Sequence, residues 1–195
     1  MSLVMPLWLQ RLICSIHDVV FKRKMREDKL YFYSKSKDVA PGKGVNEVVN
    51  DDYVELAKVK NWRRVLSNFH VHPFKYKDYT YNTIEHVFQA KKIELADPDK
   101  AFLFTLESDD PIGHGDGEIA RTNRKLVKLS KEQLFQWNHV KEKVMMAAAV
   151  EKYKVCKEAR EVLRLTGSAQ LWHIVPRGKP IRFVHLEEIR EQIVN

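Results

Sequence analysis

A row of polar side chains marks the stretch that runs from Tyr81 to Lys92. Thr83 is a favoured helix N-cap, which predicts a helix beginning directly after it. On that helix Glu85, Gln89 and Lys92 follow one another at spacings of four and three, so they share one face. Glu85 falls in the first turn, where the helix dipole favours a carboxylate. Such a face can support acid–base chemistry, although the same spacing is typical of an exposed face with an ordinary ion pair.

Two lysines are candidates for covalent chemistry. Lys35 and Lys43 flank a segment rich in glycine and proline, which includes Pro41 to Gly44. A lysine in a sheltered loop can have its pKa lowered and attack an aldehyde carbon. A solvated lysine is the other interpretation. The segment lacks the spacing and the Lys-Ser/Thr ending of a nucleotide-binding P-loop.

The histidines and one tryptophan have both structural and functional interpretations. His70 and His72 alternate on a predicted strand and share a face, but nothing fixes their distance to further ligands such as His114. The chain also lacks the zinc-protease and EF-hand motifs, so we predict no metal and no cofactor. His86 fits either a hydrogen-bonded structural group or a functional one. Trp137 fits either the core or a pocket wall that stacks on a ring.

The elements that would position these residues are mainly helices. Helices are predicted after Thr83, from Pro98, from Ser130 (with Gln133 in a capping-box position) and over Cys156–Leu165, ending near Gly167, with a last one at Glu187–Ile193. The helix after Ser130 should bury a stripe that consists of Leu134, Trp137, Val140, Val144, Ala147 and Ala148. Strands are predicted around 30–33 and 181–184, with a hairpin at 69–81. The three glycines in 113–117 predict a loop with unusual backbone angles. No alternation of strands and helices appears, so we expect a helix-rich α+β domain with a small antiparallel sheet.

The first 28 residues form a separate arm in this interpretation. Apolar residues from Leu9 to Val20 recur at spacings of three and four, which predicts an amphipathic helix, and a basic stretch from Lys22 to Arg26 follows it. The positive charge follows the apolar run, whereas a secretory signal would place it before.

Composition narrows the class of protein. The chain has 195 residues, 44% of them hydrophobic, and a net charge of +8. This length predicts one domain with a sizeable core, and the charge favours a phosphate-bearing partner. No stretch approaches the roughly 18 apolar residues of a membrane span. Cys14 and Cys156 are expected to be free thiols, which predicts a cytoplasmic or nuclear protein.

Several short motifs resemble the NADAR family, also called YbiA-like. They cover residues 31–170 in the family's order, which places a NADAR-like domain at 29–195. They are Phe32-Tyr33-Ser34, Leu66-Ser67-Asn68-Phe69, Glu85-His86-x-Phe88-Gln89-Ala90-x-Lys92, Trp137 with Val140-Lys141 and Lys143-x-Met145, and Leu163-x-x-Thr166-Gly167. The segment from Ser34 to Gly44 looks like the branch found in eukaryotes and large viruses.

The resemblance implies cleavage of an N-glycosidic bond to ribose. Glu85 would be the catalytic carboxylate and Lys35 or Lys43 a nucleophile. Substrate would be bound by Ser34, Asn68, Phe69, His86, Gln89, Lys92 and Trp137. From this resemblance, the expected substrate would be ADP-ribose attached to guanine in nucleic acid, preferably single-stranded DNA.

Two other functions remain open at this stage. The family also acts on phosphorylated ribosylamino-pyrimidine intermediates of riboflavin synthesis. The segment 171–180 departs from the Trp-Gly and Gly-x-Asn pattern of that bacterial branch. The fold could also serve as a non-catalytic reader of ADP-ribose or nucleic acid. The sequence leaves the oligomeric state open.

Overall fold

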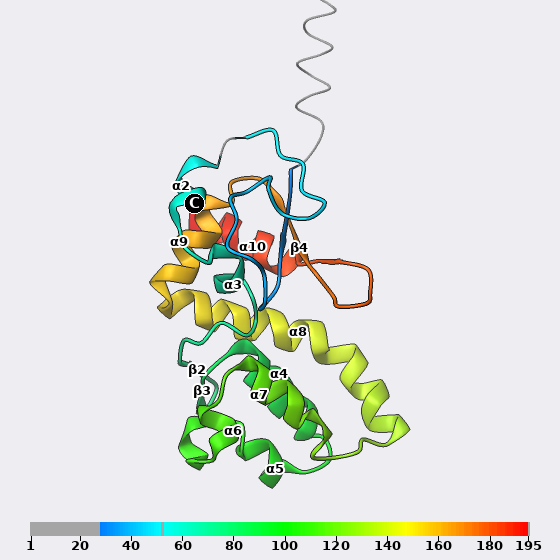
Figure 1. Ribbon diagram of the computed structural model, residues 1–195. Coiled ribbons are helices and arrows are strands. Elements are labelled where there is room, and N and C mark those ends of the chain that lie inside the picture. The colour runs from blue at the N-terminus through cyan, green and yellow to red at the C-terminus, as the bar shows by residue number, and fades with distance from the viewer. Residues whose placement is uncertain (1–27, 52, 195) are drawn as a thin grey trace, which may run out of the picture.

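The computed structural model describes residues 28–51 and 53–194 (Figure 1). The predicted arm 1–28 therefore lies outside the described residues, except for Asp28. The strands are β1 Lys29–Phe32, β2 Phe74–Tyr76, β3 Tyr79–Tyr81, β4 Gln170–His173 and β5 Ile181–Arg182. The α-helices are α2 Val54–Lys58, α3 Trp62–Val65, α4 Ile84–Ile93, α5 Pro98–Phe102, α6 Pro111–His114, α7 Gly117–Thr122, α8 Lys131–Val155, α9 Lys157–Leu165 and α10 Val184–Val194. Two 3₁₀ turns, Leu106–Ser108 and Asn123–Lys125, complete the helical part.

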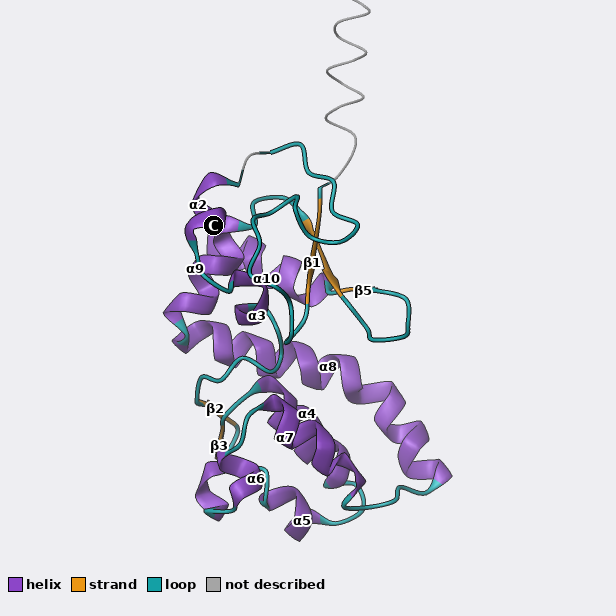
Figure 2. Ribbon diagram, in the orientation of Figure 1, coloured by secondary structure: helices purple, strands orange, loops and turns teal. Residues whose placement is uncertain are grey.

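The strands form two small sheets, which Figure 2 shows at different places among the helices. The first has the order β1-β4-β5 and the second is the β2-β3 hairpin. β1 pairs with β4 in parallel, with Lys29 opposite Gln170 and Phe32 opposite His173, while β5 is antiparallel to β4. The helix-rich α+β prediction is confirmed, but the first sheet is mixed rather than wholly antiparallel. The parallel pair escapes a local pattern search because its two strands are separated by most of the chain.

Helix α8 is the longest element within residues 28–51 and 53–194, and it packs against α4, α9 and α10. Its start is fixed as predicted, because Ser130 and Gln133 form a complete capping box. Ala148 and Ala149 of α8 are fully buried and belong to a core that includes Leu30, Phe104 and Leu171.

The predicted buried stripe of α8 is wrong at two positions. Trp137 is buried, but Leu134 and Val140 are 42% and 40% exposed. The amino-terminal half of α8 has α4 along one side, where the Trp137 ring packs against Phe88 and the Gln133 side-chain amide donates to the Leu95 carbonyl oxygen at 2.6 Å. Leu134 and Val140 lie outside this contact and stay exposed.

The glycines at 113, 115 and 117 serve close packing. None of them has a positive φ, so the predicted unusual backbone angles are wrong. A Cβ at Gly113 would lie 2.1 Å from the Thr105 carbonyl oxygen, and one at Gly117 would lie 2.4 Å from the Phe69 ring. These positions therefore bring α6 and α7 close to their neighbours. Gly167 has φ of +55° after α9, as a helix-ending glycine should.

Candidate active site

Glu85 lies in the first turn of α4, in a position set by local contacts. The Thr83 hydroxyl accepts a hydrogen bond from the His86 amide and starts the helix as predicted. The Glu85 amide donates to the Asn68 carbonyl oxygen at 3.1 Å, which joins α4 to the segment after α3. The Gln89 side-chain amide donates to Glu85 Oε1 at 2.7 Å. The predicted pair Glu85–Gln89 is therefore a buried contact, with 9% of Glu85 exposed.

Burial raises the pKa of the Glu85 carboxyl above its usual value. The Gln89 hydrogen bond and the charges of Arg121 and Arg124 counteract this rise, and the charge of Glu118 adds to it. A carboxyl with a raised pKa keeps its proton to a higher pH than an ordinary glutamate, which favours general acid–base catalysis.

Two amide oxygens beside Glu85 are buried without a hydrogen-bond partner: Asn68 Oδ1 and Gln89 Oε1. The other end of the Asn68 amide donates to Met145 Sδ at 2.8 Å, and that of Gln89 donates to Glu85. A buried acceptor without a donor costs stability, and such groups gather where a ligand supplies the missing partner. Asn68 and Gln89 are therefore placed to accept hydrogen bonds from a ligand.

A pocket of about 290 Å³ is linked to this cluster through Phe69, which follows Asn68 in the chain, although Glu85, Asn68 and Gln89 do not themselves line it. Its lining includes Ser34, Lys35 and Phe69, which the sequence predicted, together with Arg64, His70, Asp116 and Glu118, which it did not. Phe69 follows Asn68 directly, and its ring packs against Gly117. The three closely spaced glycines were the available signal for this part of the site, since they mark a close backbone approach.

Glu118 lines the pocket, and its charge helps to raise the pKa of the Glu85 carboxyl. Its Oε2 lies 3.6 Å from Lys35 Nζ, and its Oε1 accepts a hydrogen bond from the Arg121 guanidinium at 2.6 Å. The Lys35 side chain is 71% exposed, whereas the Glu118 Oε2 atom that faces it is buried. Lys35 thus stands at the rim of the pocket, paired with the Glu118 carboxylate.

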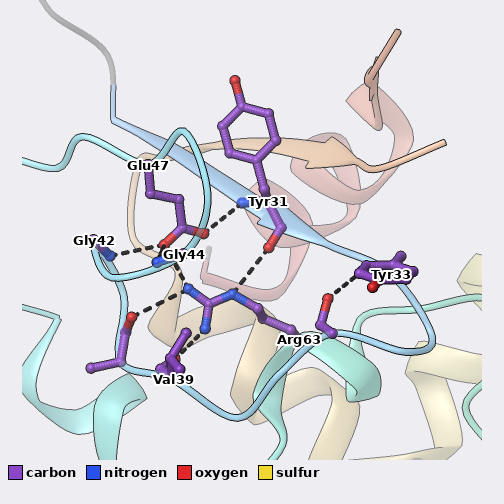
Figure 3. Close-up of polar contacts among 9 residues, drawn as sticks. Tyr31, Tyr33, Val39, Gly42, Gly44, Glu47 and Arg63 are labelled. Carbon is purple, nitrogen blue, oxygen red and sulfur yellow. Dashed lines mark hydrogen bonds and ion pairs between the residues drawn. The ribbon is translucent and has the colours of Figure 1, made fainter. Parts of the chain in front are cut away.

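Lys43 lies in a different environment, the loop around Glu47. The Glu47 carboxylate accepts hydrogen bonds from the amides of Tyr31, Gly42 and Gly44 and pairs with Arg63 at 2.6 Å (Figure 3). Both side chains of this ion pair are buried. The Arg63 guanidinium also donates to the carbonyl oxygens of Tyr31 and Val39. Lys43 is exposed on this loop and does not line the pocket.

Three predicted binding residues remain: His86, Trp137 and Lys92. Both ring nitrogens of His86 are engaged, Nδ1 with Thr83 Oγ1 and Nε2 with the Ile112 carbonyl oxygen, each at 2.8 Å. This gives His86 a structural role and leaves no ring nitrogen for a substrate. Trp137 is buried edge-on against Phe88, with ring centroids 4.7 Å apart. Lys92 is half-buried on α4.

Lys152 is a buried amine that sequence reasoning missed. It lies on α8 with 1% exposure, and its Nζ donates to the His70 carbonyl oxygen at 2.6 Å. Burial lowers the pKa of Lys152 to about 7. Because His70 lines the pocket, the buried amine holds a segment of its wall.

Replacing Lys152 by methionine is expected to flatten the pH dependence of stability. In the unfolded chain this amine is protonated below about pH 10.4, whereas in the folded chain it is protonated only below about pH 7. The free energy of unfolding should therefore rise from pH 7.5 to 9.5, by up to about 1.4 kcal/mol per pH unit from this group. Urea unfolding across that range measures the slope, and K152M should lose it. Lys154→Met, an exposed change on the same helix, is the control. An unchanged slope in K152M contradicts the assignment.

The described residues contain no cluster of three potential metal ligands, and no helix within them is long and apolar enough to span a membrane.

A larger groove of about 710 Å³ lies between α8, α9 and α10, but none of the predicted site residues line it. The cluster around Glu85, with the pocket linked to it through Phe69, is therefore the candidate active site.

Comparisons with known proteins identify the family and the fold of this chain. The model of the NADAR domain family matches residues 53–179, which is more than half of the chain. The chain belongs to the NADAR family, which includes N-glycosidase-like members. Among solved structures, the NMR structure of the E. coli protein YbiA matches with a TM-score of 0.56 and 24% identity, over 87% of each chain. That similarity establishes the fold. No curated protein sequence matches the chain.

Proposed function

We propose that this protein hydrolyses the bond between ribose C1′ and a base nitrogen, and that it removes ADP-ribose from guanine in single-stranded DNA. The observation that carries the proposal is the buried Glu85 carboxyl, flanked by two buried amide oxygens without partners. The pocket linked to this cluster has a lysine at its rim. We assign acid–base chemistry to Glu85, hydrogen bonding to the two amides and nucleophilic attack to the lysine.

Glu85 is assigned the central step. As the base leaves, positive charge develops at C1′ and O4′ of the ribose, and a nearby carboxylate stabilises it. The raised pKa of Glu85 allows the same group to give a proton to the departing nitrogen. The carboxylate that remains then takes a proton from the water that attacks C1′. Asn68 and Gln89 accept hydrogen bonds from the substrate during this step.

Lys35 offers a covalent route to the same products. Its neutral amine attacks C1′, the C1′–N bond to the base breaks, and the base takes the proton. Opening of the ribose at O4′ then gives a Schiff base between Lys35 and C1′. Water hydrolyses this imine and regenerates the amine. Lys35 is favoured over Lys43 because it lines the pocket, whereas Lys43 lies on the Glu47 loop.

The size of the pocket and the net charge of the protein support ADP-ribosylated DNA as the substrate. A pocket of about 290 Å³ is near the lower limit for small ligands, so it suits the ribose at which the bond breaks, with the rest extending along the surface. The net charge of +8 favours a polyanion. The departure of residues 171–180 from the bacterial pattern argues against the riboflavin intermediates, as does the likeness of residues 34–44 to the eukaryotic and large-virus branch.

A turnover assay on ADP-ribosylated single-stranded DNA tests the proposal. We expect release of ADP-ribose, and borohydride should trap an adduct that is lost in Lys35→Arg but kept in Lys43→Arg. Trapping that survives in Lys35→Arg contradicts the lysine assignment. If the protein hydrolyses ribosylamino-pyrimidine phosphates and leaves the DNA intact, the proposed substrate is wrong. If it binds ADP-ribose tightly but releases none from the DNA, the proposed catalytic activity is wrong.

A further inference from the structure

One face of the three-stranded sheet carries aromatic and basic side chains. Along β1, Leu30 and Phe32 are buried in the core, whereas Lys29 is exposed and Tyr31 is half-buried. Because side chains alternate along a strand, Lys29 and Tyr31 share the face opposite the core. The Tyr31 ring projects away from Glu47 and Arg63 in Figure 3.

The neighbouring strand continues this face. Trp172 of β4 stands opposite Tyr31 in the parallel register, and Leu171 beside it points into the core. The rings of Tyr31 and Trp172 have centroids 6.4 Å apart and planes inclined by only 27°. Lys29 Nζ lies 5.4 Å from the Trp172 ring centroid. The result is a pair of half-buried rings stacked at an offset, with a cation over the indole ring, which we call the aromatic platform.

We propose that the aromatic platform of Tyr31, Trp172 and Lys29 binds the single-stranded nucleic acid that flanks the modified base. Bases stack on exposed aromatic side chains irrespective of sequence, and lysines beside them contact the phosphates. This inference rests on the proposed function, because it assigns the part of the same substrate that lies outside the pocket.

The platform lies close to the pocket along the chain. Ser34, which lines the pocket, is three positions after Tyr31, so their Cα atoms lie at most about 11 Å apart. Stacked nucleotides follow one another at about 3.4 Å, so about three of them bridge that distance. Lys35 and Lys37, both exposed, come from the same segment of chain. A strand that enters the pocket with one nucleotide can therefore rest its neighbours on the two rings.

The platform is also held rigidly, which lowers the entropic cost of binding. The Tyr31 backbone donates to Glu47 at 2.8 Å and accepts from Arg63 at 3.1 Å on one side. β4 pairs with it on the other. The Trp172 indole N–H donates to Gln170 at 2.9 Å, which fixes the ring. Preorganised rings lose little freedom when a base stacks on them.

Binding of fluorescent, unmodified (dT)8 to the full chain tests the platform directly. Trp172→Ala should weaken binding about 5- to 100-fold, the usual range for loss of one stacking partner, and Trp172→Phe should restore most of it. Phe135→Ala, which removes an exposed ring on α8, is the control and should leave binding unchanged. Equal affinities of Trp172→Ala and the parent overturn the inference, as does an equal loss in the control.

Hydrolysis assays with two substrates, one with flanking nucleotides and one without, separate this inference from the proposed function. Trp172→Ala should raise KM for an ADP-ribosylated octanucleotide and leave turnover of ADP-ribosyl-guanosine unchanged. Equal effects on both substrates, or an equal loss of free ADP-ribose binding, overturn the platform. If the parent hydrolyses neither substrate while (dT)8 binding still depends on Trp172, the proposed function fails and the platform stands.

Discussion

Glu85→Gln is expected to reduce release of the base by roughly 10²- to 10⁴-fold, the usual contribution of a catalytic acid or base. The substitution keeps the size of the side chain and leaves an oxygen that can accept from Gln89, so the buried contact survives. It removes the ionisable group, and with it both the proton and the negative charge that face the developing cation. Single-turnover release of ADP-ribose measures the effect.

The matched control is Glu94→Gln at the other end of α4. Glu94 is exposed and pairs with Lys91, so this variant should keep the parent rate. Thermal melting should show both variants folded, with Glu85→Gln at least as stable as the parent because it removes a buried ionisable group. Turnover of Glu85→Gln within a few-fold of the parent removes Glu85 from the mechanism.

Glu47→Ala is expected to cost about 3–5 kcal/mol of stability, as is usual when one partner of a buried ion pair is removed. The change leaves the Arg63 guanidinium buried without its carboxylate. It also takes the acceptor from the amides of Tyr31, Gly42 and Gly44, so both β1 and the loop after it lose their anchor. Urea unfolding measures the loss.

Glu55→Ala is the control, because Glu55 pairs with Lys58 in an exposed position. Exposed pairs contribute about 0–1 kcal/mol, so this variant should stay close to the parent. If Glu47→Ala does not fold, Glu47→Gln serves instead, since its amide oxygen still accepts hydrogen bonds. A cost below about 1 kcal/mol for Glu47→Ala contradicts the anchoring role of the pair.

Local signals in the sequence predicted the parts of the fold that local contacts determine. Thr83 and Ser130 cap their helices with their own side chains, and Gly167 ends α9 with its own backbone angle. The face shared by Glu85 and Gln89 follows in the same way from helical spacing. Each of these features depends on residues a few positions apart, so a short window of sequence contains the information.

The site as a whole could not be predicted in this way, because distant segments build it. Glu118 pairs with Lys35, which lies more than 80 positions earlier in the chain. The Lys152 amine on α8 donates to the carbonyl oxygen of His70, which lies in the segment between α3 and β2. No spacing rule connects such pairs. His86 illustrates the converse, since its place in a family motif drew attention to it, while the Thr83 and Ile112 contacts make it a structural group.

The parallel pairing of β1 with β4 also has a consequence for how the protein forms. Lys29 meets Gln170 only after a loop of about 140 residues has closed, and the entropy of that closure must be overcome before the pairing stabilises anything. On a ribosome, β1 emerges early and waits for β4 until nearly the whole chain has been made. Helices α4 to α9 can assemble first from closer neighbours, which fold faster. The segment from Ser34 to Lys35 is thus fixed late, and the pocket is among the last parts of the molecule to mature.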